Sequence, residues 1–419
     1  MEVRIETMNK IINILKNQLY AISLYARQIA GTLVLFIIAR YLTVYDFGLF
    51  SSYRNIAVFC FMFANLGFND YILVSSKANV KEVKLKIALF LLNAILIAFS
   101  CCIFSNIFKL DSHLLFILVV IRTFFDGIFF QLILPYFQAS KKFNTIAIIN
   151  IAYAIFITII AILSYILKLS LTKFLMFNIT LGLINFIQCS YFARINYITV
   201  LAHIKKIMKM LDPSIFAYIG VTIAYFLYAQ IPSLYVSTQI NKEDAALYFS
   251  AFTIAAVIGL LVAAQTQKMM PEMINADKNR IKQVINDNLK IVLTITISVL
   301  IFMIIFGKLL LYILYGQKYY SNAYIILLIL TIANICVAEA AVYGTYITAS
   351  GNQKRKIPMQ LEATAITIMS LFILHKFGIY GASVSFLLAA IYTAFRYTTF
   401  TLKLLKKENI KENLWNSKN

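Results

Sequence analysis

The chain has 419 residues, of which 61% are hydrophobic and 13% are charged, and its mean hydropathy is +0.82. An ordinary soluble domain carries about a quarter charged residues, so this composition excludes one. Runs of 18 or more mostly apolar residues recur along the whole chain, each long enough to cross a hydrocarbon core of about 30 Å as a helix. The sequence therefore predicts an all-α polytopic membrane protein.

Taken in chain order, the apolar runs predict twelve membrane-spanning helices. They cover residues 18–39, 48–74, 87–107, 114–135, 145–167, 174–193, 213–236, 245–267, 291–315, 323–350, 357–374 and 378–402. Four of the five prolines stand at the ends of these spans, where a missing backbone N–H does little harm. Only Pro232 lies inside a span.

The placement of Lys and Arg predicts the orientation of the chain. If the N-terminus is inside, 26 of the 38 basic residues fall on the inner side, 7 on the outer side and 5 within spans. This bias predicts that both termini are cytoplasmic. It also accounts for the net charge of +21 without a nucleic-acid partner, and we expect none. No small-residue cleavage site precedes a mature domain, so we expect the first span to be retained.

The cysteines and histidines do not indicate a metal centre. All five cysteines fall in apolar spans without the spacing of metal ligands, and we interpret them as packing residues. The three histidines all lie near span ends.

Two pairs of segments resemble each other and suggest a duplicated six-span unit. Residues 45–57 (YDFGLFSSYRNIA) match residues 243–255 (EDAALYFSAFTIA) after a shift of 198 positions. Residues 137–144 (FQASKKFN) and 347–354 (ITASGNQK) both lie in inner loops that lead into the next span. An even number of spans per unit gives both copies the same orientation, which predicts a parallel repeat of two six-helix bundles.

The boundary between the bundles is predicted in the basic loop 194–212, which gives an N-terminal bundle over 1–212 and a C-terminal bundle over 213–419. In transporters, repeats of this kind form a central site between two bundles that rock against each other.

Four segments, in order along the chain, resemble the polysaccharide-transporter (O-antigen flippase) branch of the multidrug/oligosaccharidyl-lipid/polysaccharide (MOP) exporters. They are YDFGLFSSYRNIAVFCFMFANLGF at 45–68, ILYGQKYYSNAYIILLILTIAN at 313–334, TASGNQKRK at 348–356 and HKFGIYGASVSF at 375–386. The resemblance implies a MOP-exporter-like fold. It also implies that Gly378 makes the turn before the last span, and that Gly381 and Ala382 let this span pack closely against a neighbour.

The function implied by the resemblance is transport rather than enzymatic catalysis. The expected substrate is an undecaprenyl-pyrophosphate-linked oligosaccharide, an O-antigen or other surface polysaccharide repeat unit, moved from the inner to the outer leaflet of the bacterial cytoplasmic membrane by alternating access. No Gly-rich nucleotide-binding loop is present, so we expect no cofactor and an H⁺ or Na⁺ gradient as the energy source. We expect a monomer surrounded by membrane lipids, working beside a polysaccharide polymerase and a chain-length regulator.

Other functions fit the sequence less well. A multidrug exporter of the same superfamily shares the twelve-span plan and stays open as the alternative. Lipid II flippases usually have fourteen spans, and the Gly-Asp-Arg loop pattern of the major facilitator class is absent from 75–86. A membrane glycosyltransferase would need an acidic cluster such as Asp-x-Asp at a span end. A membrane scaffold would have little use for embedded arginines.

Ionisable residues inside the spans, with Lys268 at the inner end of the eighth, are the candidate site residues, because an ionised group at mid-membrane costs about 3 kcal/mol or more. The predicted cationic cavity for the pyrophosphate consists of Arg27, Arg54, Arg122, Lys268 and Arg396. Guanidinium groups match phosphate oxygens in pairs and stay charged at any pH, which suits a doubly charged headgroup.

The two deepest acids, Asp126 and Glu339, are the candidates for ion coupling. Structural explanations stay open for several of these residues. Arg122 and Asp126 are four residues apart and can form an intrahelical ion pair. Lys268 can extend to the membrane interface. Arg396, with Glu362 on the preceding span, lies near enough to the inner surface for a structural role.

Overall fold

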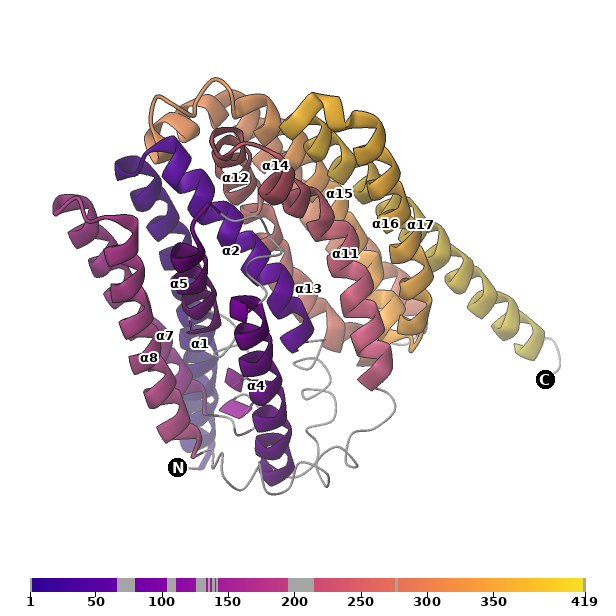
Figure 1. Cartoon of the computed structure of the whole chain (residues 1–419). Helices are drawn as coiled ribbons and strands as arrows, with labels where there is room; N and C mark the ends of the chain where they lie inside the picture. The colour runs from indigo at the N-terminus through magenta and orange to yellow at the C-terminus, as the bar shows by residue number, and fades with distance from the viewer. Residues whose placement is uncertain are drawn as a thin grey trace. The chain divides into compact units, whose positions relative to one another are not determined.

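The computed structural model describes residues 2–65, 80–103, 111–125, 133–134, 136–137, 140, 142–194, 215–275 and 278–416, and over these residues the regular secondary structure is helical (Figure 1). The first six named helices are α1 (Glu2–Tyr41), α2 (Val44–Asn65), α4 (Val80–Ile103), α5 (His113–Thr123), α7 (Phe143–Ile166) and α8 (Leu171–Ala193).

The second half begins with α11 (Ile215–Gln239), α12 (Lys242–Ala255), α13 (Val257–Asn275), α14 (Lys278–Tyr315) and α15 (Tyr324–Ala349). It ends with η3 (Gln353–Arg355), α16 (Lys356–Leu374), η4 (His375–Phe377) and α17 (Gly378–Asn416). Each of the twelve predicted spans overlaps a helix of the described residues, and the eighth is divided into α12 and α13 at Ala256. Pro232 does lie inside α11.

The helices have the length and surface of membrane spans. Eight stretches of the described chain are long and apolar enough to cross a bilayer, and one of them, Gln353–Lys406, contains both α16 and α17. Only 17% of the apolar window of α14 is buried, and large side chains such as Ile301, Ile305 and Leu309 are exposed along it. Because apolar side chains face lipid without cost, this surface is that of a polytopic membrane protein.

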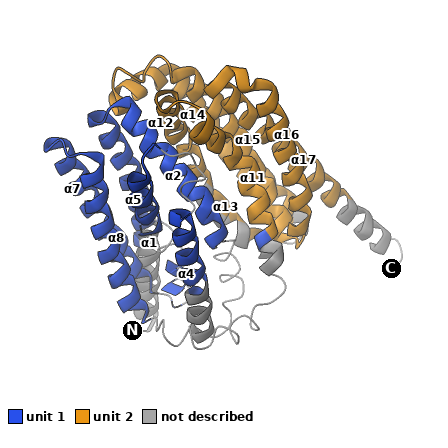
Figure 2. Ribbon diagram, viewed as in Figure 1, with its two compact units in different colours: residues 1–219 blue, residues 220–419 orange. Residues whose placement is uncertain are grey.

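The chain divides into two compact units, residues 1–219 and 220–419 (Figure 2). The predicted boundary after residue 212 falls outside the described residues. In unit 1, α1 packs on α7, α2 packs on α4 and α5, and α8 packs on α5 and α7. In unit 2, α13 packs on α14, α12 and α13 pack on α15, and α17 packs on α15 and α16. Three packed pairs of unit 1 thus have counterparts in unit 2. The pair α2–α5 corresponds to α12–α15, α5–α8 to α15–α17, and α7–α8 to α16–α17.

The first sequence echo is confirmed by identical helix starts. Before α2, the amide of Asp46 donates to Thr43 Oγ1 at 3.0 Å, and the Thr43 hydroxyl donates to the Asp46 carboxylate at 2.7 Å. Before α12, the amide of Asp244 donates to Asn241 Oδ1 at 2.7 Å, and the Asn241 amide donates to the Asp244 carboxylate at 2.8 Å. Each pair satisfies an N-terminal N–H and places a negative charge in the first helical turn.

The second echo also has two matching backbone hydrogen bonds, which join described residues within 136–142 in the first copy and within 346–352 in the second. The amides of Ser140 and Ser350 each donate to the carbonyl four residues earlier at 2.9 Å. The amide of Lys142 donates to the Phe137 carbonyl at 2.9 Å, and the amide of Asn352 donates to the Ile347 carbonyl at 3.0 Å. Together with the matched helix pairs, these hydrogen bonds are local similarities between the two units, and the parallel six-plus-six repeat stays a prediction.

The connection between α16 and α17 needs glycine at two positions. Gly378 has a φ of +55°, a conformation that side chains rarely adopt. A Cβ atom at Gly381 would overlap the carbonyl oxygen of Leu374, so the start of α17 packs directly on the end of α16. Ala382 and Ser383 are fully buried beside it. The roles expected for Gly378 and Gly381 are thus confirmed.

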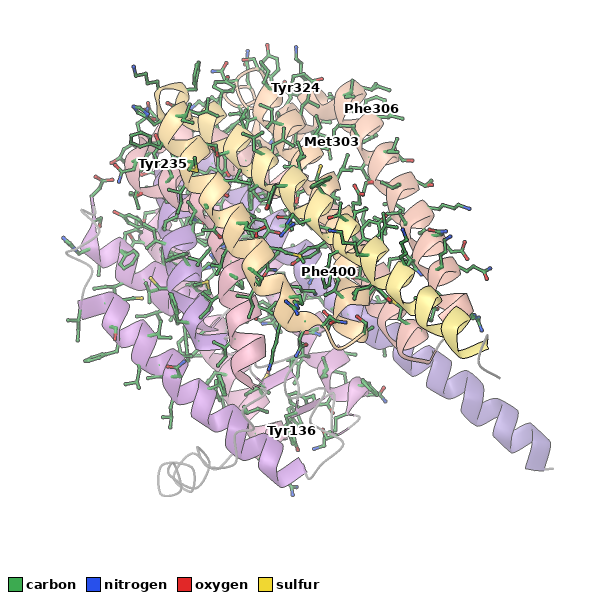
Figure 3. All side chains as sticks on the ribbon, turned by 90° about the vertical axis from the view of Figure 1, so that its right-hand side faces the viewer. Tyr136, Tyr235, Met303, Phe306, Tyr324 and Phe400 are labelled. Carbon is green, nitrogen blue, oxygen red and sulfur yellow. The ribbon has the colours of Figure 1, made fainter. Side chains whose placement is uncertain are left out.

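A second glycine turn ends α14. Gly316, with a φ of +98°, donates its amide to Tyr312 O at 2.9 Å and to Leu311 O at 3.2 Å. Tyr319, three residues later, is buried with its ring centroid 5.4 Å from that of Tyr315. The following helix is fixed by Tyr324, whose hydroxyl donates to the Ile304 carbonyl at 2.8 Å; Figure 3 labels Tyr324 close to Met303 and Phe306 of α14.

We expect cysteine labelling to report the predicted orientation, since the basic loops should lie on the cytoplasmic side. The segments expected to react only with permeant reagents are 77–86, 198–209, 278–288 and the tail after Lys403. The positions expected to react with impermeant reagents lie near Asp111, Lys242 and Lys376. A single reproducible inversion among these sites would contradict the twelve-span topology.

Candidate functional site

Arg27 is fixed at the contact between α1 and α7. Its Nη1 donates to Asn150 Oδ1 at 3.4 Å, and its guanidinium carbon lies 4.0 Å from the centroid of the Tyr153 ring. Asn150 is fully buried and donates in turn to the Oγ of Ser23, also buried, at 3.3 Å. These two contacts orient the plane of the guanidinium. The sequence interpretation missed both, although a buried Asn in an apolar span is itself a signal.

Arg122 lies at the contact of α5 with α2 and α8. It is 6% exposed, and its guanidinium carbon is 5.3 Å from the Phe50 ring centroid and 5.8 Å from that of Phe174. Aromatic faces attract a cation at such distances, and the attraction grows when water is excluded. Its proposed partner Asp126 lies outside the described residues.

The other two cations predicted in the first eight spans have different surroundings. Arg54 is exposed on α2, one turn after Phe50. Lys268 belongs to α13, but its side chain lies outside the described residues. Arg27 thus contacts α7, whereas Arg122 contacts α2 and α8, and the two arginines are held by different helices of unit 1.

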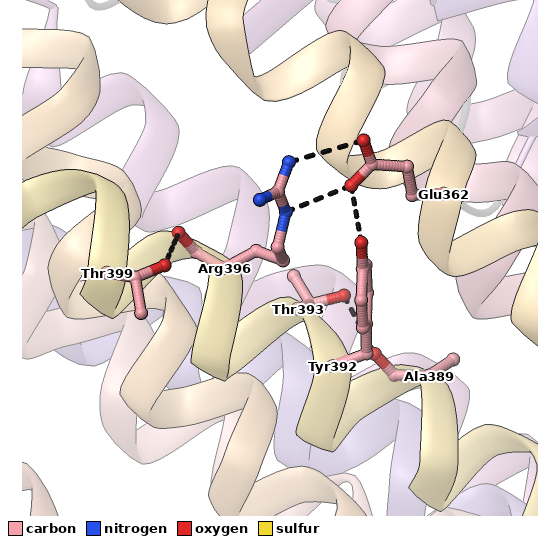
Figure 4. A network of polar contacts seen from close by, with 6 residues as sticks. All are labelled: Glu362, Ala389, Tyr392, Thr393, Arg396 and Thr399. Atoms are coloured by element: carbon pink, nitrogen blue, oxygen red, sulfur yellow. Dashed lines mark hydrogen bonds and ion pairs between the residues drawn. The ribbon is translucent and has the colours of Figure 1, made fainter.

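Arg396 faces a carboxylate in unit 2 (Figure 4). Its Nη2 donates to Glu362 Oε1 at 3.2 Å, and its Nε lies 2.9 Å from Glu362 Oε2. The hydroxyl of Tyr392, one turn before Arg396 on α17, also donates to Glu362 Oε2. The two charged side chains are 38% and 42% exposed. The sequence analysis named the two charges but missed Tyr392, because many tyrosines in these spans gave no signal to single it out.

Glu339 is half-buried on α15, and Cys336 and Tyr343 lie on the same helical face. Tyr343 belongs to a buried cluster that also includes Tyr397 of α17. The acid therefore lies beside the contact of α15 with α17.

The sequence analysis missed Lys356 as an embedded cation, because it directly follows Lys354 and Arg355 of a predicted inner loop. Lys356 donates from Nζ to Thr348 Oγ1 at 2.6 Å and lies 5.9 Å from the Tyr397 ring centroid. A Cβ atom at Gly344 would lie 3.0 Å from Cε2 of the Tyr397 ring, so the glycine makes room for the ring that Lys356 contacts. Lys356 thus points into the helix packing of unit 2.

Unit 1 also has a polar seam along α8, formed by Asn178, Gly182 and Asn185. Asn178 Oδ1 and Asn185 Nδ2 are buried and have no hydrogen-bond partner within the described part of the chain. Gly182 is needed because a Cβ atom there would come within 2.5 Å of Phe125 Cβ. This seam was not predicted, although its three members recur every three or four residues.

The searched part of the chain, which is the described residues only, contains no group of three or more His, Cys, Asp or Glu that could hold a metal ion. The five cysteines are free thiols.

The sequence matches one protein family over most of its length. Residues 37–324 match the sequence model of the family described as "Polysaccharide biosynthesis protein". The chain belongs to this polysaccharide biosynthesis family. No curated protein matches the chain significantly.

Solved structures show that this polysaccharide biosynthesis family member has the fold of MOP-superfamily transporters. The lipid II flippase MurJ, in an inward closed conformation, superposes with a TM-score of 0.74 at 16% identity over 92% of this chain and 87% of that chain. A MATE-family multidrug resistance transporter in an inward-facing conformation gives a TM-score of 0.68 at 12% identity over 91% and 95%. A MOP-superfamily transporter from Pyrococcus furiosus gives 0.60 at 12% identity over 94% and 95%.

Proposed function

We propose that the chain is a flippase for an undecaprenyl-pyrophosphate-linked oligosaccharide, which it moves from the inner to the outer leaflet of a bacterial cytoplasmic membrane. The observation that carries this proposal is the oriented cation Arg27, embedded between α1 and α7 in a member of a polysaccharide biosynthesis family. A charged group inside a membrane is costly, so its presence on α1 supports a role in transport.

The geometry of Arg27 suits an anionic headgroup. Asn150 and Tyr153 fix the plane of the guanidinium, and Ser23 fixes Asn150 in turn. A planar fork held in one orientation binds two phosphate oxygens at a lower entropic cost than a flexible ammonium does. Arg122 supplies a second cation to the same unit between two aromatic rings. An uncharged drug would gain nothing from these positive charges.

The decisive experiment is complementation of a flippase-deleted bacterium that carries the matching polysaccharide genes. We expect the chain to restore surface polysaccharide and to leave drug susceptibility unchanged. The solved multidrug transporters of similar fold support a rival, cation-coupled export of small molecules such as drugs. Drug resistance without restored polysaccharide would favour that rival and contradict the flippase proposal.

Coupling to an ion gradient is the part of the proposal that Asp126 and Glu339 carry. A carboxylate next to packed helices can alternate between protonated and ionised forms as the conformation changes. We expect the double variant Asp126→Asn/Glu339→Gln to lose most of its transport and its response to a proton gradient in proteoliposomes. The matched control is Asp287→Asn, an exposed acid on α14. Full transport and full gradient response in the double variant would exclude these acids.

A further inference from the structure

Glu362, Tyr392 and Arg396, which we call the α16–α17 triad, form a polar cluster within unit 2 (Figure 4). We propose that this triad is a subsite for the hydroxyl groups of the carried saccharide and does not bind its pyrophosphate. The inference rests on the proposed flippase function and refines it, because it separates the recognition of the sugar from that of the phosphate.

The two opposite charges of the triad cancel. The guanidinium of Arg396 faces the carboxylate of Glu362 through two nitrogen–oxygen pairs at 2.9 and 3.2 Å, so the triad has no net charge. A pyrophosphate at this place would meet the carboxylate as well as the guanidinium, and the like charges would repel. Sugar hydroxyls both donate and accept hydrogen bonds, and they match a site that presents a donor beside an acceptor.

Unused hydrogen-bonding capacity is the second argument. A guanidinium has five N–H groups, and only Nε and Nη2 of Arg396 face Glu362. Figure 4 shows the third nitrogen, Nη1, turned away from the carboxylate. The Tyr392 ring packs beside Tyr228 and Ala363, so an aromatic surface adjoins these polar groups. Aromatic walls with a few oriented polar groups are typical of small-molecule sites.

The face of α17 that carries the triad is the third argument. Leu388, Ile391 and Phe395 are 42%, 47% and 62% exposed and form the apolar stripe of this helix. Tyr392 directly follows Ile391 and Arg396 directly follows Phe395, so Tyr392 and Arg396 lie on a face rotated by about 100° from that stripe. Charged groups that are 38% and 42% exposed within a membrane-spanning helix are stable where they meet water or a polar ligand.

Other contacts hold the α16–α17 hairpin together. Partly exposed ion pairs contribute little to stability. The α16–α17 hairpin already packs through the fully buried Ala363, Thr367 and Ala389 and through the close approach at Gly381. Glu362 also lies less than two turns from the start of α16, the end predicted to be cytoplasmic, where a headgroup from the inner leaflet would enter.

The test is a pair of titrations of the purified full-length protein in detergent. One titrant is the phosphate-free oligosaccharide released from the repeat unit of the host strain, and the other is inorganic pyrophosphate. We expect Arg396→Ala and Glu362→Gln to weaken saccharide binding about tenfold, the effect of losing a hydrogen bond to a charged group. Pyrophosphate affinity and Tm should not change. The matched control is Lys403→Ala, an exposed cation two turns further along α17.

Three results would overturn the subsite. The first is a loss of pyrophosphate affinity in both variants as large as the loss of saccharide affinity. The second is an unchanged saccharide affinity. The third is a lowered Tm that the exchange variant Glu362→Arg/Arg396→Glu restores together with full saccharide binding. The last result would identify a structural latch. A wild-type protein that binds the saccharide but fails to complement the flippase-deleted host would contradict transport alone. If the Arg396→Ala and Glu362→Gln variants complement the host and keep their saccharide affinity, the subsite would be contradicted but the transport function would not.

Discussion

Replacement of Arg27 by Ala is expected to reduce surface polysaccharide in the complemented flippase-deleted host to near the level of the empty vector. The variant removes a guanidinium that Asn150 and Tyr153 hold in place. Loss of a charge-assisted contact to the substrate costs about 1.5–3 kcal/mol, which is roughly a 10- to 150-fold loss of affinity. Arg27→Lys should be intermediate, because an ammonium keeps the charge but loses the planar fork.

The control for this prediction is Arg40→Ala, which removes an exposed cation from the last turn of the same helix and should leave transport unchanged. Immunoblots of membrane fractions must show equal amounts of each protein, since a structural arginine would lower abundance when it is removed. Arg54→Ala belongs in the same series as the second predicted cavity residue. Normal polysaccharide from well-expressed Arg27→Ala protein would remove the main physical reason for preferring an anionic lipid-linked substrate to a drug.

Substitution of Gly381 by Ala or Val is expected to give the largest loss of stability of any single glycine replacement in α17. At an open helical position, Gly→Ala stabilises by about 1 kcal/mol. At Gly381 the new Cβ would overlap the Leu374 carbonyl oxygen, and a backbone atom cannot move aside without opening the hairpin. Overpacking of this kind costs about 1–3 kcal/mol, so the sign of the effect reverses.

Thermal unfolding of the purified protein in detergent measures this effect directly. Gly259→Ala in α13 is the matched control, because no atom lies within 4 Å of its added Cβ and the substitution should be neutral or stabilising. A Gly381→Ala protein that unfolds at or above the wild-type Tm would show that the α16–α17 hairpin does not depend on the close approach.

The helical spans were predictable because each depends on a short stretch of sequence. Apolar runs of sufficient length form helices in a bilayer, whatever their neighbours are, since backbone groups must be satisfied within the segment. The helix starts at Asp46 and Asp244 and the turn at Gly378 are equally local, because a capping side chain or a positive φ involves only adjacent residues. The break at Ala256, which divides one predicted span into α12 and α13, had no such local signal.

The sequence by itself thus determined which charges lie within long apolar segments, but only the tertiary structure decided what each charge meets. Arg27 and Asn150 are 123 residues apart, and Arg396 and Glu362 are 34 residues apart. Whether such groups touch depends on which helices pack and on how each is rotated about its axis. A rotation of one residue position, about 100°, would turn Arg396 from a carboxylate to a lipid-facing stripe. That rotation is fixed by the fit of many small side chains across the interface, which no single segment encodes.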